Sequence, residues 1–195
     1  MVIRDVNELV DLIDAKRQIE AIKIISVDGI NGSGKTYLSK ILCDKLDISH
    51  LNIDEHYVKK NKGSYLDFVE YEKLHKSILK STNDVKIVLI DAVCVLKILD
   101  NISLSSDLKI YVKRLIHGNY WFDGRNMDYT RSVDEVIQED REQMKNFMEL
   151  QRNIEGKKQN TNFKYREKSL FHDVLRYHFE YHPALYSDII FERLN

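Results

Sequence analysis

Glycine is scarce in this chain, and three of its seven glycines, Gly29, Gly32 and Gly34, fall within six consecutive residues. Lys35 and Thr36 follow directly, so that the segment reads G-x-x-x-x-G-K-T, the P-loop or Walker A pattern. In such a loop the glycines let the backbone curl until several N–H groups point inward at phosphate oxygens. The lysine then reaches the terminal phosphates, and the threonine hydroxyl binds Mg²⁺. The segment therefore predicts a cradle for a nucleoside triphosphate.

The sequence on either side of the loop has the required character. Residues 21–27 are apolar and rich in β-branched side chains, which indicates a buried strand. From residue 35 onward apolar side chains recur at helical spacing, which indicates a helix whose N-terminus faces the phosphates. A merely structural glycine turn is the alternative that this context disfavours. The residues expected to contact the nucleotide are Gly29, Ile30, Asn31, Gly32, Ser33, Gly34, Lys35, Thr36 and Tyr37.

Two aspartates at the ends of predicted strands are the candidates for chemistry beside the phosphates. Asp54 follows a strand expected at 48–53, and Asp91 ends an apolar run at 85–90. The carboxyl ends of parallel strands meet at one edge of the sheet, where α/β proteins bind their ligands. Asp91 is expected to hold Mg²⁺ through water, together with Thr36. The alternatives are a turn-capping role for Asp54 and an N-cap of the next helix for Asp91.

Strands and helices alternate along the chain, which predicts an α/β fold with right-handed crossovers. We expect a single domain over residues 1–195: a three-layer α/β/α P-loop fold with a mostly parallel five-stranded sheet. Residues 1–20 add an N-terminal helix, and the role of that helix, including a homodimer contact, is left open. Other helices are expected at 65–79, 92–100, 132–152 and 167–181, a loop at 153–164, and strands at 108–112 and 188–192.

The composition argues against several classes of protein. Thirty Lys and Arg against 31 Asp and Glu give a net charge of −1, which disfavours binding of nucleic acid or anionic membranes through bulk charge. No apolar run approaches the roughly 18 residues of a membrane span, and no signal segment is visible. Cys43 and Cys94 lie in separate apolar segments, which fits buried thiols in a reducing compartment. We expect a cytoplasmic protein without a nucleic-acid or membrane partner.

The chain lacks the further motifs that mark two large classes of P-loop protein. The guanine-reading pattern Asn-Lys-x-Asp of GTPases is absent, because the similar sequence at 61–64 ends in Ser rather than Asp. No L-S-G-G-Q-like sequence of a transporter ATPase occurs. A small kinase remains, which passes the γ-phosphate of ATP to a hydroxyl or phosphate of a second ligand.

Four segments resemble the uridine kinase family of P-loop kinases. Residues 27–36 contain Gly-Ser-Gly-Lys-Thr, the family's usual form of the loop. Residues 52–57 are similar to the family's Asp-x-Phe-Tyr, with His56 in place of Phe. Residues 87–112 hold a strand with an acidic end and the strand after it, and residues 187–191 are similar to the family's final Ala-Asp-Ile-Ile strand. Together these segments lie within about two-thirds of the chain.

The resemblance implies a kinase that uses ATP and Mg²⁺ and phosphorylates a small hydroxyl-bearing molecule, with a nucleoside such as uridine or cytidine as the first acceptor to test. It also implies that Asp54 is the base that accepts the hydroxyl proton, beside Lys35 on the transferred phosphate. Kinases of other small alcohols stay open. So do a nucleotide-binding regulatory protein that has lost transfer and an ATPase without an acceptor.

The family's arginine-rich lid, expected as a helical lid at 113–131, is where this chain departs from the pattern. Arg125 stands where the family's Arg-Asp pair begins, and Arg131 follows it. A guanidinium that contacts the γ-phosphate as an arginine finger can accelerate transfer by about 10³–10⁵. Arg125 and Arg131 are the candidates, with Arg114 third, and a solvated surface arginine is the alternative for each. The aromatic residues 120–122 either stack on a base or pack the lid.

Overall fold

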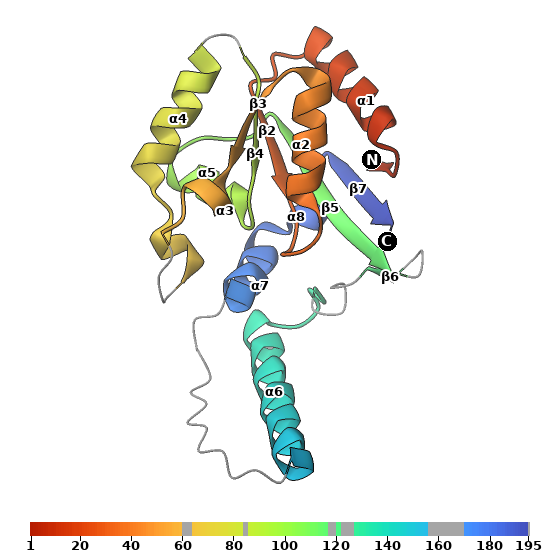
Figure 1. The fold of residues 1–195 in the computed structure, drawn as a ribbon, viewed down its shortest axis with the longest axis vertical. Helices are drawn as coiled ribbons and strands as arrows, with labels where there is room; N and C mark the ends of the chain where they lie inside the picture. Colours follow the sequence, from red (N-terminus) through yellow and green to blue (C-terminus); the bar gives the residue numbers. More distant parts are fainter. Residues whose placement is uncertain (60–63, 84–85, 117–119, 122–126, 156–169, 195) are drawn as a thin grey trace.

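A single sheet forms the frame that positions the candidate residues (Figure 1). In the computed structural model, which describes residues 1–59, 64–83, 86–116, 120–121, 127–155 and 170–194, six strands run parallel. They are β1 (Val2–Ile3), β2 (Ile24–Asp28), β3 (Ser49–Asn52), β4 (Val88–Asp91), β5 (Leu108–Ile116) and β7 (Ile189–Leu194). Their order is β1-β7-β5-β2-β4-β3, and β6 (Tyr120–Trp121) pairs antiparallel with the end of β5.

The prediction of five strands is wrong, because β1 adds a sixth parallel strand and β6 an antiparallel one. Each has only two residues, which is too short for a hydrophobic period to be visible in the sequence. β1 exists through its pairing with β7, from the other end of the chain: Val2 faces Ile190 and Ile3 faces Phe191. The five strands that were expected correspond to β2, β3, β4, β5 and β7.

Helices cover both faces of the sheet, in three layers (Figure 1). One face is covered by α1 and α2, and the other by α4 and α5. The long α6 precedes α7, which packs near the carboxyl edge of the sheet. The helices are α1 (Val6–Ile19), α2 (Lys35–Leu46), α3 (Ile53–His56), the 3₁₀ helix η1 (Tyr65–Phe68), α4 (Tyr71–Asn83), α5 (Val95–Asn101), α6 (Val133–Glu155), α7 (Leu170–Tyr181) and α8 (Pro183–Tyr186).

The central strand β2 is held from both faces, and all five of its residues are buried. Because side chains alternate between the faces of a strand, Ile25 and Val27 join the core beneath α1 and α2, whereas Ile24 joins the core beneath α4 and α5. Burial of one such side chain stabilises a fold by about 1.5–3 kcal/mol. The carboxyl end of β2, where the glycine-rich loop begins, is therefore firmly placed.

The two cysteines are buried and free, as predicted. Within the described ranges, no helix is long and apolar enough to cross a membrane.

The segment that was expected to form the lid begins as a strand. β5 continues four residues beyond the predicted end, to Ile116, because residues 113–115 pair with residues 192–194 of β7. The expectation of a helical lid is therefore wrong for residues 113–116. α6 begins where Ser132 indicated and continues to Glu155, so residues 153–155 are helical rather than loop. The rest of the predicted loop at 153–164 lies outside the described residues.

Candidate active site

The glycine-rich loop joins β2 to α2, and close contacts or backbone conformation require glycine at two of its positions, Gly29 and Gly34. A Cβ atom at Gly29 would lie 2.6 Å from Ser33 Oγ and 2.9 Å from the carbonyl oxygen of Val112 in β5. Gly34 has φ of +96°, in the left-handed region that side chains disfavour. The loop therefore folds back on itself over the end of β2 and packs against the backbone of β5 at Val112.

The loop leads straight into the N-terminus of α2. Gly34 is the N-cap residue and provides no side-chain hydrogen bond, so the first N–H groups of α2 are not capped by a side chain. Such N–H groups, with the positive end of the helix dipole, bind anions such as phosphate. Ser33 Oγ at this place is fully buried and has no hydrogen-bond partner in the described part of the chain. This end of α2 therefore offers donors to a ligand.

Lys35 and Asp54 come together beside the loop. The side chain of Lys35 is 6% exposed, and its Nζ lies 3.6 Å from Oδ2 of Asp54. Asp54 lies in α3, whose N-cap is Asn52, since Asn52 Oδ1 accepts a hydrogen bond from Glu55 N at 2.8 Å. The turn-capping alternative for Asp54 is therefore wrong. A phosphate held by Lys35 would lie next to a carboxylate.

The hydroxyl of Tyr65, in η1, orients Asp54 by donating a hydrogen bond to its Oδ1. The backbone of Tyr65 is itself held from α7, because Tyr65 N donates to Asp173 Oδ2 at 2.7 Å. Tyr65 is a residue that sequence reasoning missed, since nothing in its local pattern marks a contact with a residue eleven positions earlier. One Asp54 oxygen thus faces Tyr65, and the other faces Lys35.

Asp91 lies at the end of β4 and contacts the loop directly. Its Oδ2 accepts a hydrogen bond from Thr36 Oγ1 at 2.6 Å, and Asn52 Nδ2 lies 3.3 Å from the same hydroxyl. Its Oδ1 contacts His50 Nε2, another residue that sequence reasoning missed. The next helix, α5, has Cys94 as its N-cap, so the N-cap alternative for Asp91 is wrong.

The donor set of Thr36 and Asp91 suits Mg²⁺, because this ion prefers a few oxygen ligands and keeps several waters. A hydroxyl and a carboxylate that already share a hydrogen bond lie close enough to act on one ion. The described residues include no group of three or more His, Cys, Asp and Glu side chains that could bind a metal alone. Phosphate oxygens and waters would therefore complete the coordination, as is usual for nucleotide-bound Mg²⁺.

Asp28, at the base of the loop, is buried and accepts two hydrogen bonds. Gly29 N donates to Oδ1 at 2.7 Å, and the hydroxyl of Tyr177, in α7, donates to Oδ2. Burial raises the pKa of Asp28 to about 6, although the Tyr177 and Gly29 hydrogen bonds and the charge of Lys35 oppose the rise. The contact with Tyr177 joins residues 149 positions apart, and no local signal in the sequence predicts it.

The three arginines predicted for the lid differ in their positions relative to the glycine-rich loop. Arg131 forms an ion pair of 2.7 Å with Glu139 of α6. Arg125 lies outside the described residues. Arg114 lies in β5, and its Nη1 is 4.0 Å from the position of a Cβ at Gly32. Of these three, the described structure places Arg114 beside the loop.

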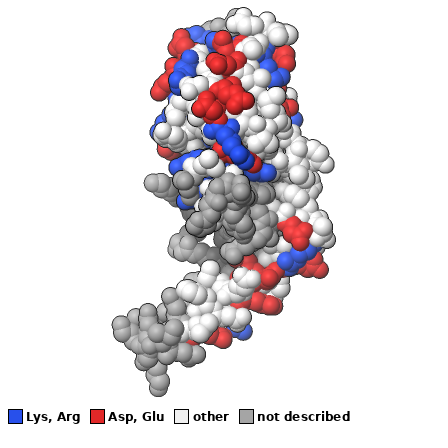
Figure 2. All heavy atoms as spheres, turned by 90° about the vertical axis from the view of Figure 1, so that its right-hand side faces the viewer, with Lys and Arg blue, Asp and Glu red and all other residues white. Residues whose placement is uncertain are grey.

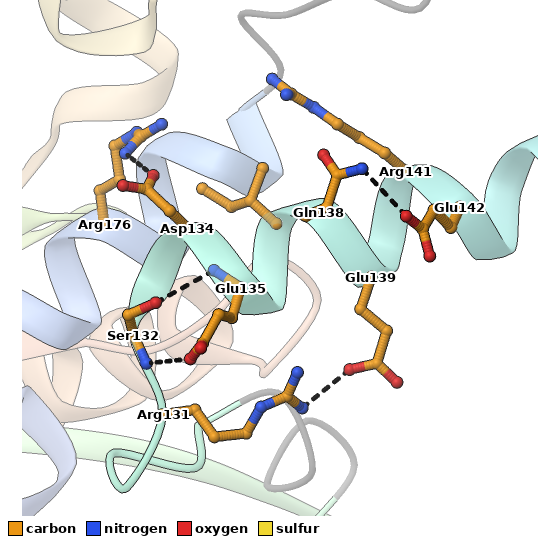
Figure 3. Close-up of a pocket in the computed structure, with 10 residues that line it drawn as sticks. Arg131, Ser132, Asp134, Glu135, Gln138, Glu139, Arg141, Glu142 and Arg176 are labelled. Atoms are coloured by element: carbon orange, nitrogen blue, oxygen red, sulfur yellow. Dashed lines mark hydrogen bonds and ion pairs between the residues drawn. The ribbon is translucent and has the colours of Figure 1, made fainter.

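A hollow of about 810 Å³ lies along the first turns of α6, away from the glycine-rich loop (Figure 3). Charged side chains line it, and Figure 3 shows them paired: Arg131 with Glu139, and Arg176 of α7 with Asp134. Ser132 and Glu135 cap α6 reciprocally, through hydrogen bonds of 3.2 and 2.9 Å. These interactions stabilise the start of α6, and no residue of the glycine-rich loop lines the hollow.

Comparison with known proteins gives a distant structural likeness only. No protein-family model and no curated protein matches the chain. A solved structure described as "a Possible Uridine Kinase from Bacillus stearothermophilus" matches with a TM-score of 0.49 and 10% identity, over 95% of this chain and 98% of that one. An uncharacterized protein from Eubacterium ventriosum matches with a TM-score of 0.33 and 13% identity, over 88% and 89%. Likeness at this level does not assign a function.

Proposed function

We propose that the protein is a kinase that transfers the γ-phosphate of MgATP to the hydroxyl group of a small molecule. The observation that carries the proposal is the 3.6 Å separation of Lys35 Nζ and Asp54 Oδ2 beside the glycine-rich loop. A γ-phosphate held by Lys35 lies next to a carboxylate that can accept the proton of an attacking hydroxyl. Transfer to a hydroxyl group requires such a proton acceptor, whereas binding of the nucleotide alone does not.

Each residue of the site has one task in this reaction. The N–H groups of the loop and of α2, with Lys35, bind the phosphates and neutralise their charge. Thr36 and Asp91 hold Mg²⁺, which offsets further phosphate charge when bound. Asp54 takes the hydroxyl proton on an oxygen, and Tyr65 keeps its carboxylate in the required orientation.

The charges beside Asp54 favour an acceptor without a phosphate group. Asp173 and Asp28 belong to the same region, since Asp173 binds the backbone of Tyr65 and the charge of Asp54 acts on Asp28. A phosphorylated acceptor would be repelled by these carboxylates. An uncharged alcohol is not repelled in this way, and its hydroxyl can donate a hydrogen bond to Asp54. A nucleoside such as uridine or cytidine is the first candidate, and other uncharged alcohols follow.

A regulatory protein that binds nucleotide without transferring phosphate is the second candidate. The ion pair between Arg131 and Glu139 favours it, because Arg131 then lies on α6 instead of on the γ-phosphate. The presence of Asp54 beside Lys35 argues against it.

Transfer of radiolabelled γ-phosphate from ATP to a panel of acceptors tests the proposal. The panel contains uridine, cytidine, uncharged sugars and vitamin alcohols, with sugar phosphates as the phosphorylated counterparts. We expect the radiolabelled phosphate to appear on an uncharged alcohol. We also expect ATP to be consumed only when that alcohol is present. Phosphate release without any acceptor would indicate an ATPase. ATP binding without transfer to any member would favour the regulatory protein.

A further inference from the structure

Two arginines face each other where the apolar part of the sheet ends. In the pairing of β5 with β7, Arg114 lies opposite Arg193. Side chains on one face of a strand alternate with those on the other, so Arg114 follows Ile110 and Val112 on the face that packs against α1 and α2. Arg193 follows Ile189 and Phe191 on that same face. The two guanidinium groups therefore extend from the face on which α2 begins.

Both side chains reach the glycine-rich loop. Arg193 Nη1 donates a hydrogen bond to the carbonyl oxygen of Ser33 at 3.5 Å. A Cβ at Gly34 would lie 3.0 Å from Arg193 Cδ and would overlap the guanidinium itself. Arg114 Nη1 lies 4.0 Å from the corresponding position at Gly32. Two of the three glycines of the loop are thus covered by an arginine that comes from a distant strand.

Like charges at directly facing positions of a sheet are unfavourable unless another group compensates them. The pair just before them shows the usual arrangement, since Lys113 faces Glu192 and Glu192 binds Arg4 at 2.7 Å. In the described part of the chain, by contrast, Arg193 has no carboxylate partner. Figure 2 shows basic and acidic side chains interspersed on the side of α1 and β7. Arg193 therefore suits an anion that binds beside the glycine-rich loop, within reach of Arg114 as well.

The order of the strands indicates which part of the nucleotide this anion is. The glycine-rich loop follows β2, Asp54 lies beyond β3 on one side, and the arginines end β5 and β7 on the other. If the γ-phosphate lies between Lys35 and Asp54, the rest of the phosphate chain extends toward β5 and β7. We propose that Arg193, together with Arg114, binds the α- and β-phosphates of ATP. This inference rests on the proposed function, because it takes the position of the γ-phosphate from it.

Titration calorimetry of Arg193→Gln with MgATP and with magnesium tripolyphosphate tests the inference. One lost charge-assisted hydrogen bond to phosphate corresponds to about a 10–100-fold loss of affinity. We expect a loss of this size for both ligands, and a smaller loss for Arg193→Lys. Arg4→Gln is the matched control, because it removes an exposed arginine that pairs with Glu192 on the opposite face of β7. It should bind both ligands as the wild type does.

A thermal unfolding measurement separates ligand binding from a structural role. The Arg193→Gln change removes the 3.5 Å hydrogen bond to Ser33 and also the repulsion from Arg114, so the ligand-free variant should be about as stable as the wild type. Unchanged affinity for both ligands would overturn the inference while leaving the kinase proposal intact. If Arg193→Gln lost affinity for MgATP but not for magnesium tripolyphosphate, the inference would also be overturned, because Arg193 would then contact the nucleoside and not the phosphates. A wild type that binds no MgATP would refute the proposed function, and this inference with it.

Discussion

Thr36 and Asp91 are linked by a hydrogen bond of 2.6 Å although they lie 55 positions apart, one at the start of α2 and the other at the end of β4. The register of the sheet produces this contact, because Asp91 faces Val27 of β2, just before the loop, and Asn52 of β3 on its other side. His50 contacts the second carboxylate oxygen and holds the group in this orientation. The hydroxyl and the carboxylate are thus already together before any ion binds.

Asp91→Asn should weaken binding of the metal ion with ATP while keeping the fold. The asparagine retains an oxygen that accepts the hydrogen bond from Thr36, but it loses the charge that attracts a divalent cation. We expect about a 10–100-fold loss in affinity for Mn²⁺, used in place of Mg²⁺, in electron paramagnetic resonance titrations with ATP present. Asp44→Asn, an exposed change on α2, is the control. Equal Mn²⁺ affinity in both variants would refute the assignment of Asp91.

Lys35→Ala should abolish transfer and weaken ATP binding by about 10–100-fold, because one charged donor to the phosphates is lost. Calorimetry with MgATP measures the affinity for ATP, and a transfer assay measures the turnover. Lys40→Ala removes an exposed lysine five residues further along α2 and should behave as the wild type. If ATP affinity and turnover both stay normal in Lys35→Ala, the loop is not used as proposed.

Asp54→Asn should leave ATP binding nearly unchanged and lower turnover by about 10²–10⁴, the range for a positioned base. The asparagine still accepts the hydrogen bond from Tyr65, so the local structure is retained. Glu55→Gln is the matched control, since it removes the adjacent carboxylate, which is 55% exposed. A variant that loses thermal stability and ATP affinity together would instead show a structural role for Asp54.

The sequence predicts those parts of the site that a local motif forms or that lie directly at the ends of strands. Gly29 to Thr36 form a contiguous pattern, and Asp54 and Asp91 each follow an apolar run. Because parallel strands end at one edge of the sheet, the alternation of strands and helices is enough to predict that these residues lie close together.

The remaining parts depend on register between distant segments. Arg193 lies beside the loop because β7 pairs with β5 over six residues, and Tyr177 reaches Asp28 because of how α7 packs. No hydrophobic period encodes either contact. The prediction of a helical lid is wrong for residues 113–116 for the same reason, since pairing with β7 extends β5 through Arg114.

Asp28→Asn should stabilise the protein at neutral pH but not in acid. Burial raises the pKa of Asp28 from 3.8 to about 6, so the folded protein binds its proton more tightly than the unfolded chain does. As the pH rises from about 4 to 6, the unfolded chain loses this proton first, and the wild type loses stability relative to the variant. The full difference, about 3 kcal/mol from the rise in pKa, is present above pH 6 and absent below about pH 4. Urea unfolding of both proteins between pH 4 and 8 measures it, with Asp11→Asn, an exposed change on α1, as the control. A difference that does not vary with pH would show that Asp28 is not held in the environment described here.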